Sequence, residues 1–170
     1  MNDLIDMCKR ERELTVSIQL NIDKWGTIDN EVKNIISEGW SNIKFLNDEG
    51  SGINEKISEV PDDMGGVYVF LIKPDIIPNI HRYVMYIGRA RRKSEFSLRK
   101  RCKGYISDTR PLVAYMREIW GKQLYLYYLP LQDDELIEKV ERELLRVVIP
   151  PCNTQIPDRY VTVMPQEAAF

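Results

Sequence analysis

The chain of 170 residues contains few residues of the types that build metal centres and disulfide networks. Its three cysteines are widely spaced and form no CxxC pair, so we expect reduced thiols rather than zinc ligands or disulfides. A histidine-built metal centre is excluded because the chain has only one histidine, and a Ser-His-Asp triad would have to rely on His81 alone. An enzyme made from this chain would therefore use carboxylates, tyrosines and arginines.

Long apolar runs are also missing. The longest, residues 67–72 and 124–129, span six residues each, whereas a membrane-spanning helix needs about 20. The first residues, MNDLIDMCKRERE, carry charges where a signal peptide has its apolar segment. With 44% hydrophobic and 29% charged residues, the composition is typical of a globular domain. We therefore expect a cytoplasmic protein that does not interact with membranes.

The charges are unevenly distributed along the chain. Residues 1–65 hold 7 Lys and Arg against 14 Asp and Glu, whereas residues 81–110 hold 10 against 2. The second segment has a net charge of +8, although the whole chain has −2. A local basic block of this kind is typical of a protein that binds a phosphate-rich partner. A solvated helix face rich in Lys and Arg would give the same count.

Hydrophobic periodicity predicts a mixed α and β chain. In the N-terminal part we expect a strand over residues 14–22 and a helix over residues 29–39. From residue 66 the expected order is strand, strand, helix, helix, strand, helix, over residues 67–72, 82–87, 97–106, 111–120, 122–129 and 133–149. Ser94 and Ser97 are both candidate caps of the first of these helices. The acidic, Gly-rich and Ser-rich stretch 47–63 marks the boundary between the two parts.

The last predicted helix carries a carboxylate on its apolar side. Glu141 falls between Val148 and Leu145, within the apolar arc that also holds Val140, when the helix is projected down its axis. A carboxylate that points into a protein is costly unless it is paired or binds a cation. A partly exposed glutamate at the rim of the apolar stripe explains the pattern equally well.

The basic helix before it shows a similar feature. Arg101 shares a face with Leu98, Cys102 and Tyr105, which follow the i, i+3, i+4, i+7 spacing of one helix side. An inward arginine needs an anionic partner, and two partners fit: Glu141 in a structural ion pair, or a phosphate in a binding site.

Four further positions have both a functional and a structural interpretation. Tyr68 and Tyr86 lie on predicted strands, where a tyrosine is most often a buried aromatic residue. Gly88 follows Tyr86 closely, so the backbone there can approach a ligand. Asn153, directly after the Pro-Pro stop, is at first sight an ordinary loop residue.

Taken in order, these positions resemble the GIY-YIG nuclease family, with a pattern most similar to the nuclease domain of the bacterial excision-repair endonuclease. The motifs that carry the resemblance are Gly66-Val67-Tyr68, Tyr86-Ile87-Gly88-Arg89-Ala90, Leu98-Arg99-Lys100-Arg101 with Tyr105, Glu141, and Pro150-Pro151-Cys152-Asn153. The resemblance implies an α+β fold with a small three-stranded antiparallel sheet flanked by helices. On this basis we divide the chain into an acidic N-terminal α/β extension (1–60) packed on the domain, the nuclease domain (61–156) and a tail (157–170).

The resemblance also implies catalytic roles by position. Glu141 would bind one Mg²⁺ or Mn²⁺ ion, and Arg101 would face the scissile phosphate. Tyr68 and Tyr86 would orient or deprotonate the attacking water, with Tyr68 as the favoured base because nearby cations would lower its pKa. Arg89 takes the place that Lys or Arg usually holds in this motif. The resemblance implies no organic cofactor.

The remaining implied positions surround this centre. Asn153 would fix the back wall of the site. The residues expected to contact the substrate are Arg91, Arg92, Lys93, Lys100, Lys103 and Tyr105. The connections at 73–82 and 93–96 are longer than in minimal members of the family and flank the site.

Together these features predict a metal-dependent endonuclease that hydrolyses DNA phosphodiester bonds, of restriction, repair or mobile-element type. Two alternatives remain open: a nucleic-acid-binding or regulatory protein that keeps the fold without turnover, and a nuclease subunit that acts only in a larger complex. For the acidic extension three roles are open: a structural brace, a self-association interface, or a docking surface for another protein.

Overall fold

A computed structural model describes residues 16–92 and 97–157 of the chain. The strands are β1 (Ser41–Lys44), β2 (Gly65–Ile72), β3 (Tyr83–Ala90) and β4 (Leu124–Leu131). The α-helices are α2 (Ile22–Trp25), α3 (Asn30–Ile36), α4 (Leu98–Lys103), α5 (Pro111–Trp120) and α6 (Asp134–Val148). Three short 3₁₀ helices connect them: η1 (Glu55–Glu59), η2 (Gly104–Ile106) and η3 (Gly121–Gln123). The expected α+β class is confirmed.

The four strands form one antiparallel sheet in the order β1-β4-β2-β3. The β2 strand is central and fully buried, and β3 lies at one edge. In the register, Tyr68 lies opposite Gly88 on β3 and Tyr128 on β4. This arrangement brings the two tyrosine-bearing strands, β2 and β3, side by side.

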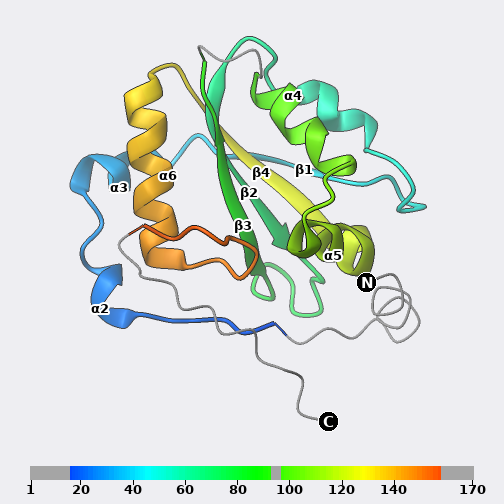
Figure 1. Ribbon diagram of the computed structural model, residues 1–170, viewed down its shortest axis with the longest axis horizontal. Coiled ribbons are helices and arrows are strands. Elements are labelled where there is room, and N and C mark those ends of the chain that lie inside the picture. The colour runs from blue at the N-terminus through cyan, green and yellow to red at the C-terminus, as the bar shows by residue number, and fades with distance from the viewer. Residues whose placement is uncertain (1–15, 93–96, 158–170) are drawn as a thin grey trace.

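Helices cover both faces of the sheet (Figure 1). Because side chains alternate along a strand, Tyr68 and Phe70 pack on the face covered by α4 and α5, in one hydrophobic cluster. The intervening Val67 and Val69 pack on the other face, against α6 and α3, in a second cluster. The sheet is therefore the middle of three layers, with a core on each side.

Local sequence signals explain where the helices begin and end. The carboxylate of Asp133 accepts a hydrogen bond from the Glu135 amide and caps α6, which stops before Pro150-Pro151. Pro111 occupies the first turn of α5, where its missing amide costs nothing. Ser97, rather than Ser94, caps α4; Ser94 lies outside the described residues. Within residues 16–92 and 97–157, no helix is long and apolar enough to span a membrane.

The expectation of a three-stranded sheet is wrong, because the sheet has four strands. The additional strand, β1, comes from the N-terminal extension and pairs with the outer edge of β4. Its sequence, SNIK, buries only Ile43, so it gives no alternating pattern from which a strand is predicted. The extension is thus packed on the rest of the chain, as expected, and also completes the sheet.

The strand expected over residues 14–22 is wrong for the part that the structure describes. Residues 16–20 have no regular structure, and α2 begins at Ile22. Ile18 and Leu20 are 52% and 69% exposed. An alternating pattern forms a strand only where an edge is open to pair with it. Here β1 occupies the outer edge of β4, and residues 152 and 153 bond to the outer edge of β3.

Candidate active site

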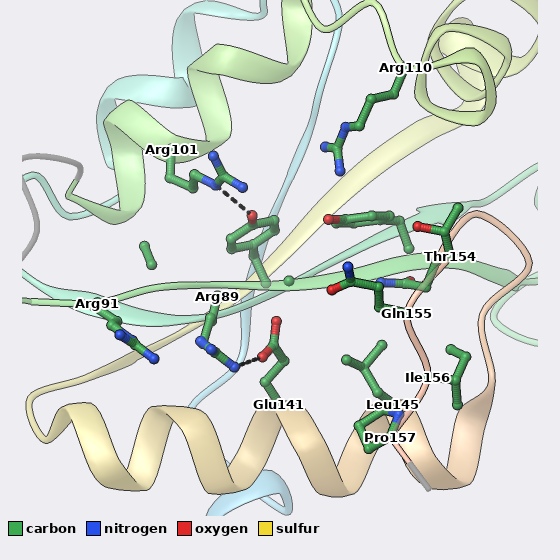
Figure 2. Close-up of a pocket in the computed structure, with 15 residues that line it drawn as sticks. Arg89, Arg91, Arg101, Arg110, Glu141, Leu145, Thr154, Gln155, Ile156 and Pro157 are labelled. Carbon is green, nitrogen blue, oxygen red and sulfur yellow. Dashed lines mark hydrogen bonds and ion pairs between the residues drawn. The ribbon is translucent and has the colours of Figure 1, made fainter. Parts of the chain in front are cut away.

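A cavity of about 980 Å³ in the described structure lies along the edge strand β3 (Figure 2). Its charged lining consists of one carboxylate, Glu141, and four arginines: Arg89, Arg91, Arg101 and Arg110. An excess of arginines around one buried carboxylate favours an anionic ligand. The tyrosines Tyr68 and Tyr86 and residues 153–157 complete much of the remaining wall.

The position at a sheet edge explains how residues from both faces meet in one cavity. Arg89 lies opposite Val67 in the register and faces α6, whereas Gly88 lies opposite Tyr68 and faces α4. Because β3 has a strand on only one side, the cavity can extend around its free edge. Figure 2 shows Arg101 and Arg110 on one side of the strand, and Arg89 and Glu141 on the other.

Gly88 is required at this point because the ring of Tyr68 lies directly against it. A Cβ atom added to Gly88 would lie 2.6 Å from the Tyr68 hydroxyl oxygen and 2.7 Å from its Cζ. Contacts this short do not occur between real side chains. The glycine of the second motif therefore makes room for the tyrosine of the first.

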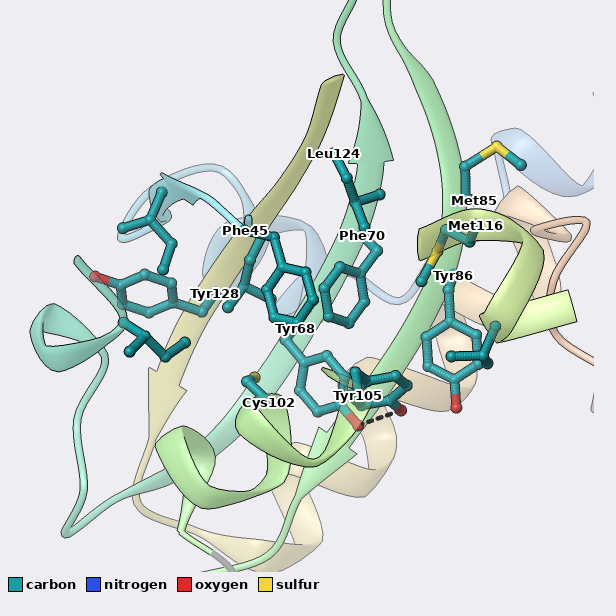
Figure 3. Packing of buried hydrophobic residues seen from close by; sticks show 14 of the residues in the cluster. Phe45, Tyr68, Phe70, Met85, Tyr86, Cys102, Tyr105, Met116, Leu124 and Tyr128 are labelled. Atoms are coloured by element: carbon teal, nitrogen blue, oxygen red, sulfur yellow. Dashed lines mark hydrogen bonds between the residues drawn. The ribbon is translucent and has the colours of Figure 1, made fainter. Parts of the chain in front are cut away.

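Tyr68 belongs to a buried aromatic cluster (Figure 3). Its hydroxyl lies 2.8 Å from that of Tyr105 and accepts a hydrogen bond from Arg101 Nε at 3.3 Å. The rings of Tyr68 and Tyr105 meet edge to face at 5.7 Å, and Tyr86 approaches Tyr105 at 5.4 Å. The structure thus brings the three tyrosines together in one group, with Tyr105 behind the cavity wall and only 2% exposed.

Burial raises the pKa of Tyr68 well above the ordinary value for tyrosine, because the charged phenolate would lose its hydration; Tyr105 adds to this effect. The expectation that nearby cations lower this pKa is therefore wrong for the protein without a bound ion. Tyr68 remains protonated and, by accepting from Arg101, holds that guanidinium in place. Burial likewise raises the pKa of Tyr105.

Glu141 points into the cavity from α6, and its side chain is only 13% exposed. Burial raises the pKa of this carboxyl, and the neighbouring Arg89 partly opposes that effect. The Arg89 guanidinium donates to Glu141 Oε2, so the ion pair considered between Glu141 and Arg101 is not the one that forms. Figure 2 shows the other Glu141 oxygen pointing into the cavity.

A second carboxylate, Glu138, links the arginines on this side of the cavity. Its Oε2 lies 2.7 Å from Arg91 Nη2 and 3.8 Å from Arg89 Nη2. Glu138 lies one helical turn before Glu141 on α6, so both carboxylates reach the same strand. The helical pattern of the sequence does not specify the proximity of Glu138 to Arg89, which follows from the docking of α6 on β3.

Arg110 lines the cavity but belongs to none of the motifs recognised in the sequence. It directly precedes Pro111, the first residue of α5. Two of its nitrogens, Nε and Nη2, donate to the carboxylate of Asp108 at 2.7–3.1 Å. Its guanidinium lies 5.6 Å from the centre of the Tyr86 ring. The Asp-x-Arg-Pro spacing before a helix was the available signal.

Asn153 holds the free edge of β3. Its side-chain oxygen accepts from the Ile87 amide at 2.9 Å, and its nitrogen donates to the Ile87 carbonyl at 2.8 Å. The amide group thus replaces a neighbouring strand at the residue before Gly88. This geometry agrees with the back-wall position expected for Asn153.

The other basic residues of the motif region lie outside the cavity lining. Lys100 and Lys103 are exposed on α4, and Arg92 is exposed after β3. Lys93, also expected to contact the substrate, lies outside the described residues. The contacts expected of these residues with a substrate remain predictions.

The donor set fits a hard divalent ion bound through one carboxylate. Among the described residues no group of three or more His, Cys, Asp or Glu side chains is placed to hold a metal. Mg²⁺ does not require such a cage, since it keeps several waters and binds through one or two carboxylates together with substrate phosphates. Glu141 supplies one carboxylate oxygen to a cavity that has room for these waters.

Comparisons of the chain with protein-family models, curated proteins and solved structures found no match.

Proposed function

We propose that the β3-edge cavity is the active site of a metal-dependent DNA endonuclease of the GIY-YIG type. One observation carries the proposal: four arginines and one largely buried glutamate line a single cavity beside two tyrosines. The arginines match the negative charge of a phosphodiester, and the glutamate is the only carboxylate of that lining. The motif order in the sequence supplies the reaction type by resemblance.

In this proposal the ion is Mg²⁺ or Mn²⁺, one per site, and Glu141 holds it. When bound, it supplies positive charge that stabilises the phosphate oxygens in the transition state. Glu141 lies on a 15-residue helix with caps at both ends, so its carboxylate has a fixed position. In the structure, Oε2 of this carboxylate is paired with the guanidinium of Arg89.

The arginines bind the substrate and stabilise its charge. We assign Arg101 to the scissile phosphate, because the protonated Tyr68 hydroxyl fixes the orientation of its guanidinium. Arg89, which reaches the cavity beside Glu141, would contact a second oxygen of that phosphate. Preorganised donors of this kind lower the barrier because they need no rearrangement as charge develops.

The two tyrosines receive different roles. Tyr68 is 0% exposed and its pKa is raised, so we assign it to positioning Arg101 rather than to removing a proton. Tyr86 also lines the cavity and is 8% exposed, so we assign it to orienting the attacking water. The base initially expected at Tyr68 is thus not part of this proposal.

We further propose that the protein acts on DNA in the cytoplasm. Cys102 and Cys152 are buried free thiols, in keeping with a reducing compartment. The acidic N-terminal extension remains a proposed docking or self-association surface, which would direct the nuclease to its partner or substrate.

A second candidate function is supported by the Arg89–Glu141 ion pair. If the arginine keeps the carboxylate, the cavity would bind nucleic acid without cutting it. Binding without cleavage in the presence of Mg²⁺ or Mn²⁺ would favour this non-catalytic function.

The test is incubation of supercoiled plasmid with the purified protein and Mg²⁺ or Mn²⁺, with EDTA as the metal-free control. We expect nicked or linear product from the wild type and none from Glu141→Gln. Arg142→Gln is the matched control, because Arg142 neighbours Glu141 in sequence, is exposed and lies outside the cavity lining. No cleavage by the wild type, or equal cleavage by Glu141→Gln, would refute the proposed function.

A further inference from the structure

The arginines of the cavity are divided between two opposite walls (Figure 2). Arg89 and Arg91 belong to β3 and its end, and their acidic partners, Glu138 and Glu141, lie on α6. On the other side, Arg101 projects from α4 and Arg110 from the segment that begins α5. Figure 2 shows Arg101 and Arg110 at separate places along this second wall, so their guanidinium groups can contact different phosphates.

Arg110 is held in place by contacts that are independent of Glu141. The Asp108 carboxylate accepts from its Nε and Nη2 and also from its backbone amide. Arg117, on the next turns of α5, donates to the Asp108 carbonyl at 3.0 Å and to that of Tyr105 at 3.2 Å. These hydrogen bonds fix the backbone of the turn that carries Arg110.

Aromatic rings set the direction of the same guanidinium. It lies 5.6 Å from the centre of the Tyr86 ring and 5.7 Å from that of Tyr105. Arginine stacks well on aromatic faces while its edge stays available for hydrogen bonds. The Arg110 side chain is 51% exposed, and it lines the cavity. A fixed, accessible arginine of this kind is suited to bind an anion.

The size of the cavity points to more than one phosphate. At about 980 Å³ it lies at the upper end of the range for small-ligand pockets, ~300–1,000 Å³. A phosphate with its sugar fills only part of that space. Consecutive phosphates of one strand would reach both Arg101 and Arg110.

We propose that Arg110 binds a second backbone phosphate, next to the one held by Arg101 and Arg89. The substrate class of the site is then an internal stretch of a polynucleotide strand with at least two consecutive phosphodiesters. This inference rests on the proposed function for the identity of the first phosphate. It adds that mononucleotides and single phosphodiesters bind weakly.

The test measures the binding of two thymidine trinucleotides by NMR titration in EDTA. One contains two natural phosphodiesters, and in the other a neutral methylphosphonate replaces one of them, with each position tested in turn. We expect the methylphosphonate at either position to weaken binding to the wild type roughly tenfold, as loss of a charge-assisted contact predicts. In Arg110→Gln the effect at one position disappears and the effect at the other remains, because only one phosphate has lost its partner.

Arg142→Gln is the control for net charge and keeps the wild-type difference. Arg110→Lys, which retains the charge, keeps part of the methylphosphonate difference. Thermal unfolding of each variant checks that the fold is intact. The inference is overturned if Arg110→Gln shows the same methylphosphonate effects as the wild type, or if the wild type shows an effect at only one of the two positions.

The two proposals fail separately. A wild type that loses the trinucleotide preference in Arg110→Gln but never cuts plasmid DNA would keep the second-phosphate site and refute the nuclease. A wild type that cuts DNA and binds both trinucleotides equally would keep the nuclease and refute the second-phosphate site.

Discussion

At the scale of single residues, the site depends on close contacts that allow no added atom. The Tyr68 ring rests on Gly88, and its hydroxyl holds Arg101. Asn153 bonds to both backbone groups of Ile87. Each contact joins a motif residue to a neighbour from a distant part of the chain, so each can be tested by one substitution.

We predict that Gly88→Ala lowers the free energy of unfolding by about 1–3 kcal/mol, the usual cost of overpacking. The added methyl would displace Tyr68 and therefore also Arg101, so plasmid cleavage should fall. Urea unfolding and the plasmid assay measure the two effects. Gly104→Ala is the matched control, because a Cβ at Gly104 meets nothing within 4 Å and its φ of −57° suits any residue. Equal stability of the two variants would contradict this account.

For Asn153→Asp we expect a loss of about 2 kcal/mol, since the variant keeps the acceptor for the Ile87 amide but opposes two oxygens at the Ile87 carbonyl. Urea unfolding at pH 7 measures it. The exposed Asn34→Ala, on α3, should change stability by less than about 0.5 kcal/mol. If the free energy of unfolding of Asn153→Asp equals that of the wild type, the edge of β3 needs no amide partner.

At the scale of elements, the sequence predicted what short-range signals specify. Asp133 and Pro150 mark the ends of α6, and its period places Glu141 on the inner side, as the structure has it. It could not predict that Arg89, rather than Arg101, pairs with Glu141, because that depends on how α6 docks on β3. The strand β1 was missed because four residues with one buried side chain give no periodicity.

The docking of α6 on the N-terminal segment has a pH-dependent contribution. Arg146 donates to Glu143 Oε2 at 2.7 Å and to the Thr27 carbonyl at 3.0 Å. The Arg146 guanidinium holds the pKa of the Glu143 carboxyl below its usual value of 4.5. A carboxyl with a lowered pKa in the folded state stabilises the fold above its unfolded pKa, and this stabilisation is lost as the pH falls through the folded value.

We therefore predict that Glu143→Gln is less stable than the wild type by about 1 kcal/mol at pH 7, the upper range for a partly exposed ion pair. At pH 3 the difference should shrink, because the stabilisation is lost as the pH falls toward the folded pKa of this carboxyl. Urea unfolding at both pH values measures it. A difference that is the same at pH 3 and pH 7 would show that the ion pair is not its source.

At the scale of the whole molecule, the acidic N-terminal part and the basic cavity belong to one folded unit. Residues 41–44 extend the sheet, and Phe45, Leu46 and Val60 are at most 1% exposed in the cluster that also holds Tyr68. Tyr68 therefore shares its core with the extension. Composition separates the two parts, since charge and Gly content change near residue 60, whereas the contacts between them are long-range.

A chain that begins at residue 61 should consequently fail to unfold cooperatively in urea, whereas the full chain should. The point variant Phe45→Ala, in the full chain, should cost about 3–5 kcal/mol as a large cavity forms. A shorter chain with the unfolding free energy of the full protein would show that the extension is dispensable for the core.

The central claim is that Glu141 serves the chemistry of the cavity and not its affinity for DNA. The most direct measurement pairs single-turnover cleavage of an end-labelled DNA duplex with its binding, for the wild type and Glu141→Gln in the same buffer with Mn²⁺. We predict metal-dependent cleavage by the wild type, a cleavage rate at least about 100-fold lower in the variant, and binding that is retained and weakened by salt in both. Cleavage that survives the substitution, or a wild type that binds the duplex and never cuts it, would contradict the account.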